Sequence, residues 1–398
     1  MDVAALKQAV CDEVDRLAPM LLDVAHRIHE RPELAFEEHY AHELLTDAIE
    51  QEGHSPQRGA YGVPTGFAAD AGTSGPRIAV LCEYDALPEI GHACGHNVIA
   101  AAGLGAGLAA ATVAERAGGR VAMIGTPAEE GGGGKIVMAR HGAFDGIDAA
   151  MMIHPADADL IRMDAIAIQQ LEVSFHGRAA HAAAAPHEGR NALDAAVLGY
   201  MSVAALRQHI LPTERIHGIF TKGGDKPNIV PKETAMQWYV RSPTSASLQP
   251  LKERVLHCLE GSAHACECTM SSEWDDFPYA DMRDNGPMVA SYVANAARIG
   301  RDVVDPERIG RRVVGSTDMG NVSYLVPSIH PMVQVAPAGV PIHTPEFASW
   351  ARRAEGDRAV LDGAKAMAMT IVDLWCDAAL RASVADVFAS VGPDRSVI

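Results

Sequence analysis

Residues 77–82 read RIAVLC, and this short apolar stretch decides the fold. Two similar runs follow it, VAMIG at 121–125 and AAMMI at 149–153, and helical patterns separate the three. An uninterrupted apolar run of this length is typical of a strand buried on both faces, and alternation of such strands with helices favours a parallel sheet. We therefore expect an α/β fold in which helices flank a mainly parallel central sheet. A strand at 331–336 and a final helix over 345–379 continue this pattern, and residues 393–398 read as a loose tail.

The middle of the chain has a different pattern. Residues 171–176 alternate apolar and polar side chains, as a half-exposed strand does. The expected elements that follow are a helix near 191–209, strands near 216–221 and 234–241, a helix near 247–263 and a strand near 266–271. Their order, β-α-β-β-α-β, is that of the ferredoxin-like unit. We expect an inserted ferredoxin-like α+β domain over 168–277, within an α/β domain formed by 1–167 and 278–398.

Charge and cysteine content narrow the class of protein. The 398 residues include 33 Lys+Arg and 51 Asp+Glu, so the formal net charge of -18 argues against nucleic acid or an anionic membrane as a partner. The longest stretch without charged residues or His, 97–114, is shorter than the about 20 residues that a spanning helix needs, and it reads as a buried helix. The N-terminus lacks the pattern of a signal peptide, and the seven cysteines are scattered without zinc-finger spacing. We expect a cytoplasmic protein.

Side chains that bind metals follow four of the predicted strands. In chain order they are Asp85, Cys94 and His96, then Glu129 and Glu130, then His154, and last His343. Ligands of an open α/β sheet lie beyond the carboxyl ends of its strands, so these residues converge on one edge and predict a metal site. A thiolate, imidazoles and a carboxylate favour zinc, with manganese, cobalt and iron as alternatives.

Each of these residues also has an ordinary structural interpretation. A Glu-Glu pair is usually solvated, and a cysteine among apolar residues is usually an inert part of the core. Cys94 beside His96 also fits a nucleophile with its base, although no third orienting group is evident. His92 is either a core residue or a support for the metal site. The glycines at 131–134 followed by Lys135 do not complete a phosphate-binding loop, because Ile136 replaces the required Ser or Thr.

Adjacent carboxylates suit a division of labour. One of Glu129 and Glu130 can bind metal while the other accepts a proton from metal-activated water. The residues alone leave open which carboxylate has which task.

Five stretches resemble peptidase family M20, the aminoacylase/carboxypeptidase metallohydrolases. Residues 83–97, EYDALPEIGHACGHN, look like the family signature, and the further stretches are 126–132, 177–182, 223–231 and 315–323. The resemblance extends from about residue 29 to about residue 347. It is strongest with the amidohydrolase branch that includes the p-aminobenzoyl-glutamate hydrolase subunits and the β-alanyl-lysine/Xaa-Arg dipeptidases.

The resemblance implies roles for individual residues. It implies two metals, held by Cys94, His96, Glu130, His154 and His343, with Glu129 as the general base. It implies that the inserted domain is a lid that usually dimerises, and that its His181 stabilises the oxyanion in the active site of a partner subunit. Asn228 and Arg241 then lie where the lid contacts substrate. Much of the family has His-x-Asp after the first strand, whereas this chain has Glu83-x-Asp85, so Asp85 is expected to support a ligand. Asn97 replaces a frequent Asp, which leaves the number of metals open.

These observations predict a metal-dependent hydrolase, with zinc favoured over manganese or cobalt. It would cleave the amide bond of a small dipeptide or N-acyl amino acid as a homodimer formed through the lid. The alternatives are a carboxypeptidase-like enzyme that releases glutamate from an aryl amide, a non-catalytic metabolite-binding member of the family, and a metal-storage or sensor protein. The presence of Glu129, Glu130 and His343 disfavours the non-catalytic member of the family, and a metal-storage or sensor protein is disfavoured because Glu129 has no role in it.

Overall fold

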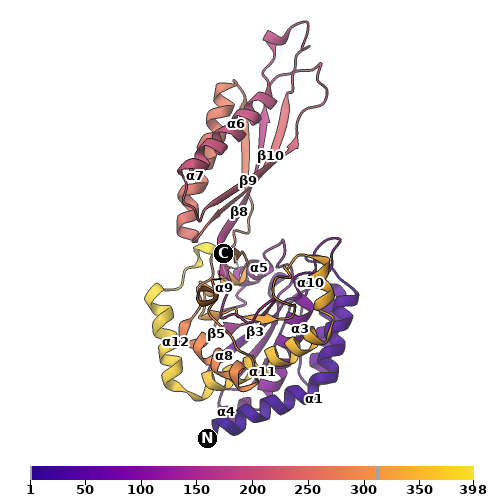
Figure 1. Cartoon of the computed structure of the whole chain (residues 1–398), viewed down its shortest axis with the longest axis vertical. Coiled ribbons are helices and arrows are strands. Elements are labelled where there is room, and N and C mark those ends of the chain that lie inside the picture. The colour runs from indigo at the N-terminus through magenta and orange to yellow at the C-terminus, as the bar shows by residue number, and fades with distance from the viewer. Residues whose placement is uncertain (1, 311–313) are drawn as a thin grey trace. The chain divides into compact units, whose positions relative to one another are not determined.

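The computed structural model describes residues 2–310 and 314–398 and divides the chain into two compact units (Figure 1). The larger unit combines the residues up to Asp164 with those from Met282 onward, and the smaller unit spans Ala165–Asp281. The predicted boundaries at 168 and 277 lie just inside the two ends of the smaller unit.

The larger unit is built on a six-stranded sheet. Its strand order is β1 (Gln57–Arg58), β2 (Phe67–Ala71), β4 (Arg120–Gly125), β3 (Arg77–Cys82), β5 (Ala149–Met151) and β13 (Ser328–Ile329). The pairings from β4 through β3 and β5 to β13 are parallel, whereas β2 pairs antiparallel with β4 and with β1. The prediction of a mainly parallel central sheet is confirmed.

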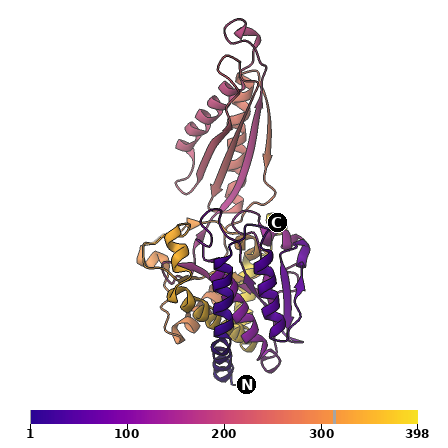
Figure 2. The ribbon, with the colours of Figure 1, turned by 90° about the vertical axis from the view of Figure 1, so that its right-hand side faces the viewer.

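Strand β3 is buried on both faces of this sheet. Ile78 and Val80 belong to one hydrophobic core with the helices α1 (Val3–Glu30), α3 (His96–Ala111) and α11 (Ala354–Cys376), which pack against one another (Figures 1 and 2). Ala79 and Leu81 belong to a second core on the opposite face. Both faces must therefore be apolar, and this requirement produces the continuous run at 77–82. Helix α3, which contains most of the predicted buried stretch, is buried along its length except at its last residue.

The remaining elements of the larger unit are short or peripheral. They are α2 (His39–Gln51), α4 (Ala114–Ala117), α5 (Gly134–Arg140), β6 (His154–Ala156), β7 (Asp164–Ala165), α8 (Gly286–Arg298), β12 (Val314–Gly315), α9 (Met319–Ser323), β14 (Met332–Gln334), α10 (Pro345–Trp350) and α12 (Ala378–Val391). The strand expected at 331–336 is only β14, and it pairs with β6 in a separate two-stranded sheet.

The predicted final helix is wrong in its continuity, because the chain forms α10, α11 and α12 there. Arg353 is extended, with φ of -90° and ψ of 179°, and separates α10 from α11. Asp377 is also extended, and its side chain accepts hydrogen bonds from the N–H groups of Ala379 and Leu380. This N-cap starts a new helix and turns the chain.

The C-terminal tail is not loose, contrary to expectation. Val397 is buried, and its carbonyl accepts a 2.6 Å hydrogen bond from Asn321 Nδ2. The Asp394 N–H donates to the carbonyl of Tyr324 at 2.9 Å. These contacts anchor the tail on the segment that contains α9.

The smaller unit is an antiparallel sheet covered by two helices on one face (Figure 2). Its strand order is β11 (Thr269–Trp274), β8 (Ala167–His176), β10 (Glu233–Ser242) and β9 (Arg215–Lys222), and its helices are α6 (Ala192–Leu206) and α7 (Ser245–Ala265). The order along the chain, β8-α6-β9-β10-α7-β11, is the predicted ferredoxin-like order. The last strand starts three residues later than expected because Cys266 caps α7 and Glu267 turns the chain with φ of 53°.

Two further properties concern the chain as a whole. All seven cysteines are free thiols. Within residues 2–310 and 314–398, no helix combines the length and hydropathy needed to cross a bilayer.

Candidate active site

The carboxyl ends of β3 and β4 carry the acidic residues of the site. Asp85 follows β3, and the loop after β4 carries Glu129 and Glu130. This loop is closely packed, since a Cβ on Gly134 would lie 1.8 Å from the carbonyl oxygen of Pro127. Ala128 adopts φ of 61°, and its N–H donates to Glu38 Oε1 at 2.8 Å. Glu38 therefore holds the turn that places the two glutamates.

Asp85 orients one of the predicted ligands. His96 is the first residue of α3, and its Nδ1–H donates to Asp85 Oδ1 at 2.9 Å. Asp85 Oδ2 accepts a 2.9 Å hydrogen bond from the N–H of Glu130. Burial alone would lower the pKa of His96, but the neighbouring charge of Asp85 outweighs burial and raises the pKa well above its usual range. In the neutral form that a metal ligand requires, the contact with Asp85 places the hydrogen on Nδ1 and leaves a lone pair on Nε2, which is the usual arrangement behind a metal-bound histidine. Asp85 thus lies where a supporting residue is expected.

Cys94 and His154 meet beside His96. His154 Nδ1–H donates to the carbonyl of Pro155 at 2.8 Å, and its Nε2 lies 3.3 Å from Cys94 Sγ. Burial, followed by the charge of His96, lowers the pKa of His154 to about 4, so this imidazole is neutral and can act as a ligand. Burial, followed by the charge of Glu130, raises the pKa of the Cys94 thiol well above its usual range. Only a nearby cation favours the thiolate there.

Both glutamates approach the same imidazole nitrogen. Glu129 Oε2 and Glu130 Oε1 are each 3.8 Å from His96 Nε2, and Glu130 Oε1 is 3.5 Å from Nε2 of His343. His343 has φ of 62°, its N–H donates to the carbonyl of Ala93 at 2.8 Å, and its side chain is 50% exposed. Burial, followed by the charges of Glu83 and Glu130, raises the pKa of Glu129 well above its usual range.

Three overlapping sets of side chains offer ligand atoms that lie within 4.8 Å of one another. The sets are Cys94, His96 and His154; Cys94, Glu130 and His343; and Glu83, His96 and Glu129. The first two sets share Cys94 and contain all five predicted ligands.

The buried atoms of the site fit a cation. His96 Nε2, Glu83 Oε2 and Glu130 Oε1 are buried and have no hydrogen-bond partner within the described part of the chain. Such atoms are rare in proteins, and here each of them belongs to at least one of the three sets. Sulfur, imidazole and carboxylate donors together suit zinc and similar divalent ions.

The other predicted residues belong to the smaller unit. His181 is exposed, and its Nδ1 accepts hydrogen bonds of 3.2 Å from the N–H groups of Ala183 and Ala184. A neutral His181 therefore carries its hydrogen on Nε2, where it can be donated. The carbonyl of Asn228 accepts a 3.1 Å hydrogen bond from Ala182, which joins the two loops. Arg241 is half-buried on β10, opposite Arg215 of β9.

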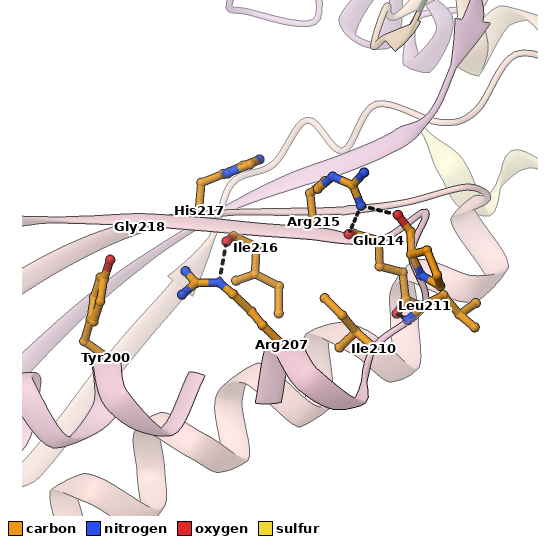
Figure 3. A pocket seen from close by; sticks show the side chains of 10 residues that line it. Tyr200, Arg207, Ile210, Leu211, Glu214, Arg215, Ile216, His217 and Gly218 are labelled. Atoms are coloured by element: carbon orange, nitrogen blue, oxygen red, sulfur yellow. Dashed lines mark hydrogen bonds between the residues drawn. The ribbon is translucent and has the colours of Figure 1, made fainter. Parts of the chain in front are cut away.

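A cavity of about 760 Å³ lies wholly within the smaller unit and contains none of the candidate ligands (Figure 3). Figure 3 shows Arg215 and His217 on one side of strand β9 and Tyr200 and Arg207 on the other. Arg207 Nε donates to the carbonyl of Ile216 at 3.1 Å, and Arg215 Nη1 donates to the carbonyl of Glu214 at 2.6 Å. The charged groups of this cavity are engaged by the backbone, so we do not assign the chemistry to it.

Sequence reasoning missed several buried polar residues near the site. Lys135 pairs with Glu83 and Asp318, and His330 lies edge-on to His154 with 5.3 Å between ring centroids. Lys135 stands between a run of glycines and a run of apolar residues, and this unusual position could have indicated a buried charge. Nothing in the sequence marks His330 as a neighbour of His154.

Comparisons with known proteins agree with this geometry. Residues 80–372 match the model of "Peptidase family M20/M25/M40". The Xaa-Arg dipeptidase of Mus musculus is 38% identical, over 96% of this chain and 92% of the relative. A p-aminobenzoyl-glutamate hydrolase subunit of Escherichia coli (strain K12) is 31% identical, over 90% of this chain and 89% of the relative. A solved Bacillus subtilis structure, described as a dinuclear metal-binding peptidase from the M20 family, shares the fold with a TM-score of 0.69, 20% identity and coverage of 90% and 99%.

Proposed function

The chain belongs to peptidase family M20/M25/M40, and from this premise we propose that it is a metal-dependent hydrolase that cleaves the amide bond of a small dipeptide or N-acyl amino acid. One observation carries the proposal. Two ligand sets share Cys94, and Glu129, a carboxylate outside both sets, lies 3.8 Å from His96 Nε2. A storage site needs the ligands but has no use for the additional carboxylate.

In this proposal the two sets hold two divalent cations. Cys94, His96 and His154 hold one, and Cys94, Glu130 and His343 hold the other. The donor set favours zinc, although manganese and cobalt also fit. When bound, such ions supply the Lewis acidity that polarises an amide carbonyl and lowers the pKa of water.

Proton transfer is the task of Glu129. Its carboxylate accepts a proton from the attacking water and returns it to the nitrogen of the leaving amine. The raised pKa of Glu129 suits this role, because a more basic carboxylate takes up the proton more readily. Glu130 instead holds metal, since its Oε1 faces Nε2 of His343.

We propose that the smaller unit is a lid that binds substrate and completes the site. His181 would donate its Nε2–H to the oxyanion of the tetrahedral intermediate, a contact commonly worth ~3 kcal/mol. Asn228 and Arg241 would bind the substrate, with the Arg241 guanidinium suited to a carboxylate. The preferred substrate is a dipeptide with a basic C-terminal residue, as the name of the mouse relative suggests. A glutamate-releasing aryl-amide carboxypeptidase is the alternative that the bacterial relative suggests.

We also propose a homodimer formed through an apolar patch of the smaller unit, which we call the α6–β9 patch. It consists of Val197, Leu198 and Met201 on α6 and Phe220 on β9, all of them at least 40% exposed. Tyr200 and Phe220 stack at 5.8 Å, so the helix and the strand adjoin. β9 is an edge strand, and an edge of this kind is a ready template for pairing with another chain.

A cytoplasmic location completes the proposal. The free state of all seven cysteines suits a reducing compartment. The partner expected at the active site is a small molecule.

The function is tested with a panel of dipeptides, N-acyl amino acids and p-aminobenzoyl-glutamate, scored by released amine with zinc, manganese or cobalt. Glu129→Gln should keep its metal while kcat falls by about 10²–10⁴-fold, because an amide cannot accept the water proton. Glu130→Gln is the matched control and should lose metal affinity instead. The reverse pattern would exchange the two roles, and full activity of both variants would overturn the hydrolase assignment.

Subunit mixing tests the lid and the dimer together. His181→Ala and Glu129→Gln homodimers should each be inactive, but a heterodimer has one site with both residues intact if His181 acts on the partner. Random mixing should then restore about a quarter of the wild-type activity. The dimer-disrupting variant Met201→Lys should prevent this recovery. No recovery between mixed dimers would place His181 in its own subunit's site or outside catalysis.

A further inference from the structure

Lys135 is a buried cation that the proposed reaction does not use. Its side chain is fully buried, and its Nζ lies 2.5 Å from Glu83 Oε1 and 2.5 Å from Asp318 Oδ1. Asp318 Oδ2 also accepts a 2.9 Å hydrogen bond from the N–H of Lys135. Asp318 thus fixes both the backbone and the ammonium of this residue at the start of α5.

The other oxygen of Glu83 faces the metal site. Glu83 Oε2 lies 3.5 Å from His96 Nε2 and, within the described residues, has no hydrogen-bond partner. Glu83, His96 and Glu129 also form the third set of atoms within 4.8 Å of one another. This set offers one imidazole and two carboxylates, which together can bind a divalent cation.

Occupation of that third set would harm the reaction. It would take His96 away from Cys94 and His154, and it would bind Glu129 as a ligand. A carboxylate that is bound to a cation is a poor acceptor for a proton. The chain therefore needs a device that keeps Glu83 from binding metal.

We propose that Lys135 is a positioning residue that withholds Glu83 from the metals and so keeps Glu129 available for proton transfer. The inference rests on the proposed function, because it assumes that metals occupy the two sets that share Cys94. The ammonium already neutralises Glu83 through Oε1, and its charge repels a divalent ion from Oε2. Asp318 restricts the movement of the ammonium, because its Oδ1 contacts Nζ while its Oδ2 accepts the backbone N–H of the same residue.

The charge of Lys135 is secure. Burial alone would lower its pKa, but the neighbouring charges of Asp318 and Glu83 outweigh burial and raise the pKa above its usual value. Lys135, Glu83 and Asp318 together carry one net negative charge. Variants that preserve this net charge allow a fair comparison with the wild type.

The single variant Lys135→Met would leave two buried carboxylates unpaired and is expected to fold poorly. Two double variants keep one net negative charge in the cluster. Lys135→Met/Asp318→Asn releases Glu83, whereas Lys135→Met/Glu83→Gln removes Glu83 as a ligand. Each variant leaves one carboxylate without the ammonium: in the first it is at position 83 and faces His96, and in the second it is at position 318.

Apo forms of the wild type and both variants are titrated with cobalt(II). Stoichiometry is followed by calorimetry, and the Cys94 thiolate–cobalt charge-transfer band is followed by absorption. Lys135→Met/Asp318→Asn should bind additional cobalt per chain or lose intensity in the thiolate band, and its kcat should fall at least 10-fold with KM nearly unchanged. Lys135→Met/Glu83→Gln should keep the wild-type stoichiometry and band.

Identical cobalt binding by both variants and the wild type would overturn the inference. Equal changes in both variants would also overturn it, since Lys135 would then act only as a structural cation. Failure of the proposed function is distinguishable, because a wild type that binds cobalt but releases amine from no substrate would refute the hydrolase and leave the titration interpretable.

Discussion

Replacement of Asp85 by Asn tests how the site is held together. Asp85 accepts two hydrogen bonds, one from His96 Nδ1–H and one from the N–H of Glu130, each 2.9 Å long. Asn is close in shape, but its single oxygen can accept only one of them, and its NH₂ group then faces the other donor. Loss of a buried hydrogen bond to a charged group costs ~1.5–3 kcal/mol.

That free energy corresponds to a decrease in metal affinity of about 10–150-fold. The range agrees with the ~10–100-fold that is typical when the partner behind a metal-bound histidine is replaced. The affinity of the apo protein is measured by competition against a chromophoric chelator. Activity is measured as a function of free metal, and Asp85→Asn should regain most of its kcat when metal is in excess.

Asp70→Asn is the matched control. Asp70 lies within β2 and also pairs with a basic side chain, but its partner is Arg77 and its side chain is 49% exposed. This variant should bind metal as the wild type does. If Asp85→Asn binds metal as tightly as Asp70→Asn, then Asp85 does not support a ligand, and the ordering of the site that we describe is wrong.

Three further predictions concern the metals, the pH dependence of stability and the tail. Cys94→Ala should lose both metals, whereas His154→Ala and His343→Ala should each lose one, as elemental analysis would show; two retained metals in Cys94→Ala would exclude a shared ligand. Burial raises the pKa of Asp284 to about 7, so the folded state keeps a proton that the unfolded state loses above about pH 4, and stability falls as pH rises from 4 to 7. Asp284→Asn should therefore stabilise the protein at pH 8 relative to pH 5 by roughly 2.5 kcal/mol in denaturant titrations, and an equal effect at both pH values would contradict this. Val397→Asp should lower the free energy of unfolding by about 1–3 kcal/mol if the tail is anchored, while exposed Val391→Asp should have little effect.

The fold could be predicted largely because its main signals are local. The run at 77–82 coincides with β3, since a strand covered on both faces must be apolar throughout. The alternation at 171–176 lies within β8, whose two faces differ in exposure. The prediction of one final helix was wrong because it relied on the same local apolar period. Its apolar period continues through α10, α11 and α12, and only the capping side chain of Asp377 and the extended Arg353 show where the chain turns.

The anchoring of the C-terminal tail could not be predicted from the local sequence. Residues 393–398 are a short terminal segment that begins with a proline and follows a glycine, which is typical of a loose end. They are held because Asn321 and Tyr324, far away in the sequence, present a donor and an acceptor to them. Such contacts depend on the tertiary arrangement and leave no period in the sequence.

Contacts between residues far apart in the sequence also distinguish the candidate ligands from their neighbours. Glu83, Glu129 and Glu130 are the same residue type, and their oxygens lie 3.5, 3.8 and 3.8 Å from His96 Nε2, so neither identity nor distance assigns their roles. Contacts with other residues distinguish Glu83 and Glu130 from Glu129. Lys135 binds Glu83, and Asp85 fixes the backbone of Glu130. Both contacts join residues more than 40 positions apart, and a metal-ligand motif read along the chain contains neither of them. A sequence can therefore indicate which side chains are candidate ligands, but the buried charges around those side chains distinguish the roles that we propose for them.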